Sequence, residues 1–158
     1  MKRARQPWDI GDVFTVPTSD GRYAVGQAID YPGPLRSVAV ALFAHILNTH
    51  AAALVQDVSS AKLISAVFTS DDLLESGRWH VAGRKPVTIP AAMFPGEHTL
   101  ARGGVGNKVI GSANLAAFVE AYFGLGPWDR FADPTYMDQL LISRDKKPKK
   151  LVFKSVTQ

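Results

Sequence analysis

The sequence predicts an α+β domain, in which two or three helices pack against a strongly bent, partly barrel-like antiparallel β-sheet. Two observations support this fold class. Short stretches of alternating apolar and polar residues, separated by turn residues, occupy most of the first ninety positions and are typical of antiparallel strands. The clearest helical spacing of apolar residues comes later, between positions 112 and 141.

The first predicted unit is a β-hairpin in the stretch GDVFTVPTSDGRYAVGQ, residues 11–27. Residues 12–17 and 22–29 alternate as strands, and residues 18–21 (TSDG) form the turn between them. Gly21 can adopt the positive φ that closes such a turn. Gly26 lies inside the second strand, which predicts a bulge or the close approach of another chain segment.

Residues 36–47 predict a third strand after the turn sequence YPGP at 31–34. Val38, Val40, Leu42 and Ile46 share one strand face and Phe43 lies on the other, so we expect both faces to be buried. The alanine-rich composition also allows a helix for part of residues 39–58. Residues 61–68 predict another strand. After the polar break 69–77, residues 78–86 complete a second hairpin-like unit, and the following loop carries a short strand near 98–101.

The clearest helix begins after Ser112, a good N-cap residue, and ends at Gly124, a good residue for the position after the C-cap. Its apolar residues recur at i, i+3, i+4 and i+7, which predicts one packed face: Leu115, Phe118, Val119 and Tyr122.

A second helix is predicted to begin at Asp133 as N-cap, with Pro134 in the first turn, and to run through Leu141.

The chain of 158 residues is expected to form one domain. Residues 1–7 are a basic N-terminal arm, and residues 144–150 are a basic linker to a last strand in LVFKSV, residues 151–156. The net charge of +4 comes from these two ends. Residues 1–5 carry three cations and residues 144–158 carry six against Asp145, whereas residues 6–143 have nine Lys and Arg against thirteen Asp and Glu. The body is therefore acidic, and we expect it to attract a basic partner.

Composition excludes several classes of protein. There is no cysteine, so the chain has neither a disulfide framework nor a zinc–thiolate site. The N-terminus meets Pro7, Trp8 and Asp9 where a signal peptide would have its apolar core. The most apolar stretch, residues 37–47, is shorter than the roughly 20 residues that span a bilayer. We therefore expect a cytoplasmic protein that does not enter a membrane.

Catalytic and metal-binding motifs are not recognisable. The histidines are His45, His50, His80 and His98, and neither His45 nor His50 has a carboxylate at metal-ligand spacing. The chain has no Gly-x-Ser-x-Gly elbow, and the Gly-rich stretch at residues 103–108 departs from phosphate-loop spacing. We therefore predict a protein that is not an enzyme and holds no metal or cofactor.

Two stretches resemble the immunity protein 26 family of bacterial polymorphic toxin and contact-dependent inhibition systems. The resemblance covers roughly residues 8–90. It rests on a Gly-Asp-hydrophobic strand, a Gly-Arg/Lys-Tyr-x-x-Gly strand and a later Gly-x-Trp-x-hydrophobic-x-Gly-x-x-Pro element. The matching positions are Gly11, Asp12, Gly21, Tyr23, Gly26, Gly77, Trp79, Val81, Gly83 and Pro86.

The resemblance implies a non-enzymatic protein that binds a cognate toxin domain and blocks it by occlusion. Glycines, one large aromatic residue and one proline shape backbone and core, so we interpret the motif residues as structural. An acidic body would suit a nuclease toxin with a basic substrate cleft. We expect the toxin to contact residue types that are common in interfaces, in the acidic break before Arg78 and in PWDRFADPTY, residues 127–136. The predicted contacts are Asp71, Asp72, Glu75, Trp128, Asp129, Arg130, Asp133 and Tyr136.

The alternative is a small nucleic-acid-associated module that uses its basic termini. Few aromatic residues are interleaved with the terminal cations, and the alternation of LVFKSV predicts that Phe153 is buried, where it could not stack on a base. The sequence therefore gives this alternative less support than toxin binding.

Overall fold

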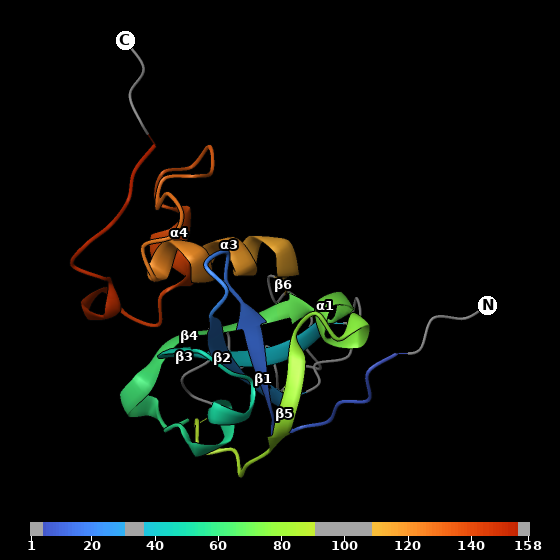
Figure 1. Ribbon diagram of the computed structural model, residues 1–158. Helices are drawn as coiled ribbons and strands as arrows, with labels where there is room; N and C mark the ends of the chain where they lie inside the picture. Colours follow the sequence, from blue (N-terminus) through green and yellow to red (C-terminus); the bar gives the residue numbers. More distant parts are fainter. Residues whose placement is uncertain (1–4, 31–36, 91–108, 155–158) are drawn as a thin grey trace.

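The structure is a computed structural model that describes residues 5–30, 37–90 and 109–154. It confirms the α+β class, with one six-stranded mixed sheet in the order β5-β1-β2-β3-β4-β6 that is partly curled but not closed (Figure 1). The strands are β1 (Asp12–Pro17), β2 (Tyr23–Asp30), β3 (Ser37–Leu47), β4 (Leu63–Ser70), β5 (His80–Arg84) and β6 (Val109–Ile110). The α-helices are α1 (Asp72–Ser76), α3 (Ser112–Tyr122) and α4 (Tyr136–Leu140), and the 3₁₀ turns are η2 (Ala51–Val55), η3 (Ser60–Lys62) and η5 (Arg144–Lys146).

The sheet is covered on both faces. Alternate residues of β3 point to opposite sides, so Val40 and Leu42 enter one apolar core while Ala41 and Phe43 enter the other. The first core is closed by α1, α3 and α4, and the second lies beneath η2 and the residues that follow β5. This confirms that β3 is a buried strand and not a helix. The pairing register shifts between β1 and β5, between β2 and β3, and between β3 and β4, so these ladders are locally irregular.

The β1–β2 hairpin forms as predicted, with Gly21 at φ +85°. Gly26 confirms the predicted close approach: a methyl group there would lie 2.5 Å from Cζ of Phe14 and 3.1 Å from Cδ2 of Leu42. The Phe14 ring also stacks on the ring of Trp79, with 5.3 Å between the ring centroids and 5° between the ring planes. Both aromatic rings are fully buried, so Phe14 fixes strand β5 and the glycine of β2 together.

The prediction of a second hairpin-like unit is wrong. Strand β5 pairs antiparallel with β1 at the opposite edge of the sheet, while β4 lies between β3 and β6. Helix α1 and Gly77, at φ +83°, redirect the chain after β4. Burial of Trp79 against Phe14 then favours pairing of β5 with β1. The side-chain amide of Gln6 stabilises the connection from α1 to β5, because it donates to the carbonyl oxygens of Leu74 and Trp79, both at 2.8 Å.

Helix α3 matches its predicted span, but not its predicted N-cap. Gly111 occupies the N-cap position, and Ser112 is the first helical residue. The Ser112 hydroxyl donates to Oδ1 of Asp72 at 2.6 Å, so it joins two helices. At the other end Gly124 has φ +77°, and Leu125 N–H bonds to the Glu120 carbonyl at 2.8 Å, a Schellman motif.

The C-terminal elements are shorter than predicted. Helix α4 begins at Tyr136 and not directly after Asp133. The Asp133 carboxylate accepts hydrogen bonds from the backbone N–H and the hydroxyl of Thr135, so residues 133–135 form a turn before the helix. The predicted last strand is reduced, in its described residues, to one parallel bridge between Pro127 and Val152. The loop after residue 90 with its short strand, the turn at 31–34 and the Gly-rich stretch at 103–108 lie outside the described residues.

Substituting Gly26→Ala should lower the free energy of unfolding by about 1–3 kcal/mol, because the new methyl group overlaps the Phe14 ring. Chemical denaturation would measure the loss. In a Phe14→Leu background, which removes the overlapping ring edge, Gly26→Ala should lower the free energy of unfolding by a smaller amount. Gly126→Ala is a control, since a methyl group there meets only ordinary contacts. An equal cost in both backgrounds would contradict the proposed overlap.

Candidate functional site

The three predicted acidic contacts near α1 are largely engaged within the protein. Asp72 accepts hydrogen bonds from the hydroxyls of Ser70 at 2.8 Å and Ser112 at 2.6 Å. Glu75 forms an ion pair with Arg5 at 3.4 Å. Asp71 precedes α1, where its carbonyl accepts a bond from the Glu75 N–H at 2.9 Å. Asp72 therefore joins α1 to α3, and Glu75 joins α1 to the N-terminal stretch.

The protonation of Asp72 reflects this structural role. Partial burial raises the pKa of its carboxyl, but hydrogen bonds from Ser112, Ser70 and backbone amides outweigh it, so the pKa is lowered overall. The group stays ionised near neutral pH and holds the first residue of α3.

Trp128 was predicted to contact the toxin, and this is wrong: the residue is only 2% exposed. Its ring packs against Phe118 at 5.9 Å between centroids, and its Nε1–H donates to Oδ1 of Asp138 at 3.1 Å. Burial of a large aromatic side chain in the first core leaves no face for a partner. Trp128 is therefore a core residue that holds α4 near α3.

The other predicted contacts in residues 127–136 lie around Trp128. Asp129 accepts a hydrogen bond from the Lys154 backbone N–H at 2.8 Å. Tyr136 packs edge-on against Phe131 and accepts a bond from Nδ2 of Asn114 at 3.3 Å. Asp133 is exposed but caps the turn before α4. Arg130 is exposed and has no side-chain partner among the described residues.

Residues 144–154, here called the C-terminal segment, pass beside this group and are fixed to it. The Trp128 N–H donates to the Val152 carbonyl at 2.7 Å, and Asp129 binds the backbone at Lys154. Lys147 forms an ion pair with Asp138 at 2.9 Å and lies 5.8 Å from the centre of the Trp128 ring. Trp128 and Asp129, two of the predicted contacts, thus hold this segment in place.

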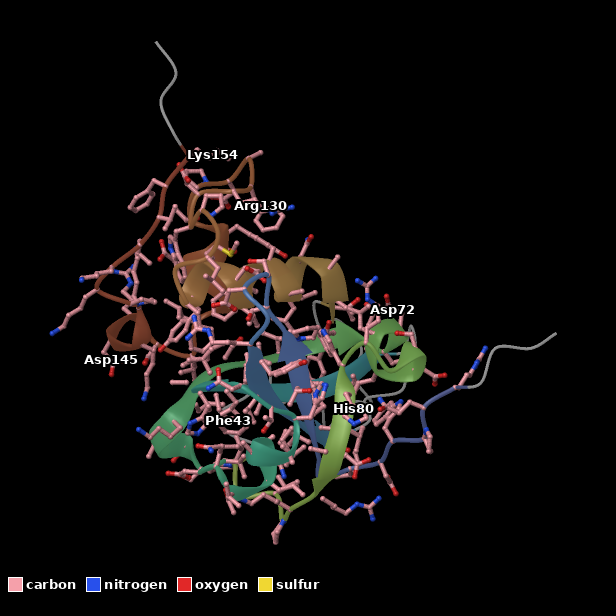
Figure 2. The ribbon with its side chains drawn as sticks, viewed as in Figure 1. Phe43, Asp72, His80, Arg130, Asp145 and Lys154 are labelled. Atoms are coloured by element: carbon pink, nitrogen blue, oxygen red, sulfur yellow. The ribbon has the colours of Figure 1, made fainter. Side chains whose placement is uncertain are left out.

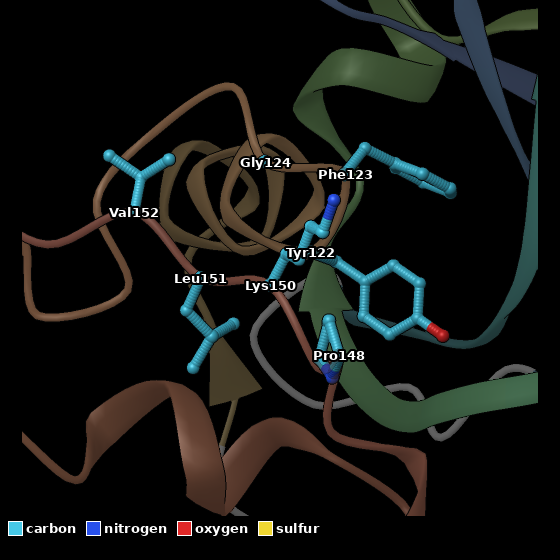
Figure 3. A pocket seen from close by; sticks show the side chains of 7 residues that line it. All are labelled: Tyr122, Phe123, Gly124, Pro148, Lys150, Leu151 and Val152. Atoms are coloured by element: carbon cyan, nitrogen blue, oxygen red, sulfur yellow. The ribbon is translucent and has the colours of Figure 1, made fainter.

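An apolar groove of about 410 Å³ lies between the C-terminal segment and the end of α3 (Figure 3). Lys150 contributes a cation to its lining, and its side chain extends toward Phe123 in this view. The remaining lining residues are Tyr122, Phe123, Gly124, Pro148, Leu151 and Val152. The groove therefore combines aromatic and aliphatic walls with one ammonium group.

Next to the groove, Val152 is 43% exposed and Phe153 57% exposed. The prediction that Phe153 is buried is wrong, because no neighbouring strand continues the pairing beyond the single bridge at Val152 in the part of the chain that the structure describes. Three exposed lysines, at positions 149, 150 and 154, flank these apolar residues in the sequence, and the exposed Arg130 follows Asp129, which binds the Lys154 backbone. We call this surface the basic–apolar patch; it comprises Arg130, Lys149, Lys150, Val152, Phe153 and Lys154.

The four patch cations have no side-chain partner among the residues the structure describes. Figure 2 shows Arg130 and Lys154 at the same end of the molecule, well away from Asp72 and His80. A second hollow, of about 670 Å³, is lined by residues of α4 and of the C-terminal segment, among them Asp138, Arg144 and Lys147.

A second cluster, which the sequence spacing did not reveal, brings His50 and His80 together. Their ring centroids are 4.6 Å apart. The ring of Tyr23 also packs on His50, with 4.1 Å between the two ring centroids. Nδ1 of His50 and the buried hydroxyl of Thr15 share a hydrogen bond of 2.6 Å. Burial lowers the pKa of His50, and the charge of His80 lowers it further. The pairing of β1 with β5 places His80 opposite Thr15, and Thr15 binds His50. These contacts join residues far apart in the sequence, so no local pattern predicts them.

Comparison of the chain with protein-family models, curated proteins and solved structures finds no match. Within the described ranges, no three potential ligand side chains are grouped to hold a metal ion. None of the helices there has the length and apolarity to cross a bilayer.

Acidification should loosen the C-terminal segment. Burial raises the pKa of Asp138, but bonds from Lys147 and Trp128 outweigh it and lower the pKa below the ordinary value of 3.8. The ion pair therefore contributes fully above that value and is lost as pH falls through the lowered pKa. The Trp128 indole N–H signal in an NMR pH titration would report the change. Asp138→Asn keeps an acceptor without the charge, so its indole signal should lose this transition; an unchanged transition would contradict the assignment.

The His50 environment should make the fold less stable as pH falls. Because the pKa of His50 is lowered in the folded state, the unfolded chain takes up the proton first, near its ordinary value of 6.5. Urea unfolding between pH 7.5 and 5.5 should show this decline. His50→Asn should reduce the slope. A slope equal to that of the native protein would refute the explanation.

Proposed function

We propose that this chain is an immunity protein that binds a cognate bacterial toxin domain and neutralises it by covering it, with no chemistry of its own. The observation that carries the proposal is the place of the motif residues in the fold. Gly26 gives room to Phe14, Trp79 stacks on Phe14, and Gly83 packs against Leu54. The sequence features that resemble an immunity protein family are thus framework, which fits a protein whose function resides in its surface.

A fixed surface suits inhibition by occlusion. A stable interface of this kind buries about 1,200–2,000 Å², and it is tighter when its side chains are already ordered before binding. Here the C-terminal segment is ordered by Trp128, Asp129 and Asp138, so it can present a preformed face.

The test is co-expression with the toxin domain encoded beside the gene for this chain. We expect growth to be restored, and the two purified proteins to form a complex in isothermal titration calorimetry. Gly26→Ala provides a destabilised variant that should rescue less well at elevated temperature. Toxicity that persists although both proteins are made and folded would refute the proposal.

A second function, single-stranded nucleic-acid binding, is favoured by one observation. Phe153 is exposed beside Lys154 and the other patch cations, an arrangement that can stack on a base while lysines contact phosphates. A salt-dependent shift of a dT20 oligonucleotide would support it. Failure to bind dT20 at low salt would exclude it.

A further inference from the structure

We propose that the basic–apolar patch is the docking face for the partner, and that the partner presents to it an acidic segment with an exposed apolar side chain. This inference rests on the proposed function and names the chemistry of the partner's contact. It also moves the contact away from the acidic residues that the sequence analysis favoured.

The first argument is charge. Arg130, Lys150 and Lys154 are exposed, and their side chains have no partner among the described residues, whereas Asp72, Asp129 and Asp138 accept internal bonds. A carboxylate from a partner can therefore bind these cations without displacing an existing pair. Complementary charge of this kind accelerates association and selects acidic partners.

The second argument is the groove beside the cations. Its walls include the side chains of Tyr122, Phe123 and Leu151, and its volume of about 410 Å³ is enough for an apolar side chain. Val152 and Phe153 extend the apolar surface outward from it, and both are large hydrophobic residues exposed to solvent. An apolar anchor in such a pocket, surrounded by polar contacts, is the usual arrangement of an interface hot spot.

The third argument is order. Leu151 packs against the first core, and the backbone that follows it is fixed by hydrogen bonds at Val152 and Lys154. The backbone of the patch is therefore ordered before binding, which lowers the entropy lost on association. A nucleic acid could use the cations and Phe153, but it would leave the groove unfilled, so an acidic protein segment accounts for more of the surface.

Two variants test the inference against the toxin domain. Phe153→Ala removes the exposed ring, and the double variant Lys150→Glu/Lys154→Glu reverses two charges. Each should weaken binding about 10-fold or more, with the melting temperature unchanged. The matched controls are Val55→Ala, a residue 81% exposed on η2, and Lys62→Glu, which should bind as the native protein does.

A probe that does not depend on the toxin accompanies this experiment: a fluorescein-labelled peptide of alternating Asp and Glu with a central Leu-Phe pair. Its anisotropy should rise with the native protein and not with the double variant, and a peptide with Lys in place of the acids should not bind. The oligonucleotide dT20 is measured in parallel.

The outcomes separate the two proposals. Toxin binding that is unchanged in the patch variants would overturn this inference and leave the proposed function intact. Absence of toxin binding by the native protein, with patch-dependent binding of the acidic peptide, would refute the proposed function while supporting the docking chemistry. Tighter binding of dT20 than of the peptide, lost in Phe153→Ala, would overturn the inference in favour of nucleic acid.

Discussion

The fold depends on the Phe14 ring, which is enclosed between Gly26 on one side and Trp79 on the other. A planar ring of this size fits only because residue 26 has no side chain. The stack in turn joins β5 to β1, although Phe14 and Trp79 are far apart in the sequence. Close packing transmits this constraint, since the same core receives the apolar face of α3.

Helix α3 extends this order to the C-terminal segment. Its residue Phe118 contacts Trp128, and Trp128 holds both Asp138 and the backbone of Val152. The segment is therefore fixed by side chains from the core, although it forms little regular structure of its own. This explains how a lysine-rich sequence, which by composition resembles a solvated tail, lies in a defined position against the domain.

The charge of the molecule has a different meaning in three dimensions than in the sequence. Counted along the chain, the body is acidic and the ends are basic, which suggests that the body attracts the partner. In the fold, however, several body carboxylates serve as hydrogen-bond acceptors: Asp72 for two hydroxyls, Asp129 for a backbone amide and Asp138 for an indole. Net charge counts these groups equally with free ones, whereas a partner meets only what is left exposed and unpaired.

The sequence by itself determined the local structure. The alternation of β1 and β2, the turn at Gly21, the close approach at Gly26 and the end of α3 at Gly124 depend on neighbouring residues and on the backbone freedom of glycine, so they could be predicted. The tertiary structure alone decided which edge β5 joins, that Trp128 is buried and Phe153 exposed, and that His50 meets His80. Those outcomes depend on contacts between distant residues, such as Asp72 with Ser112 across 40 positions and Thr15 with His50 across 35, and no local pattern encodes which distant partners will meet.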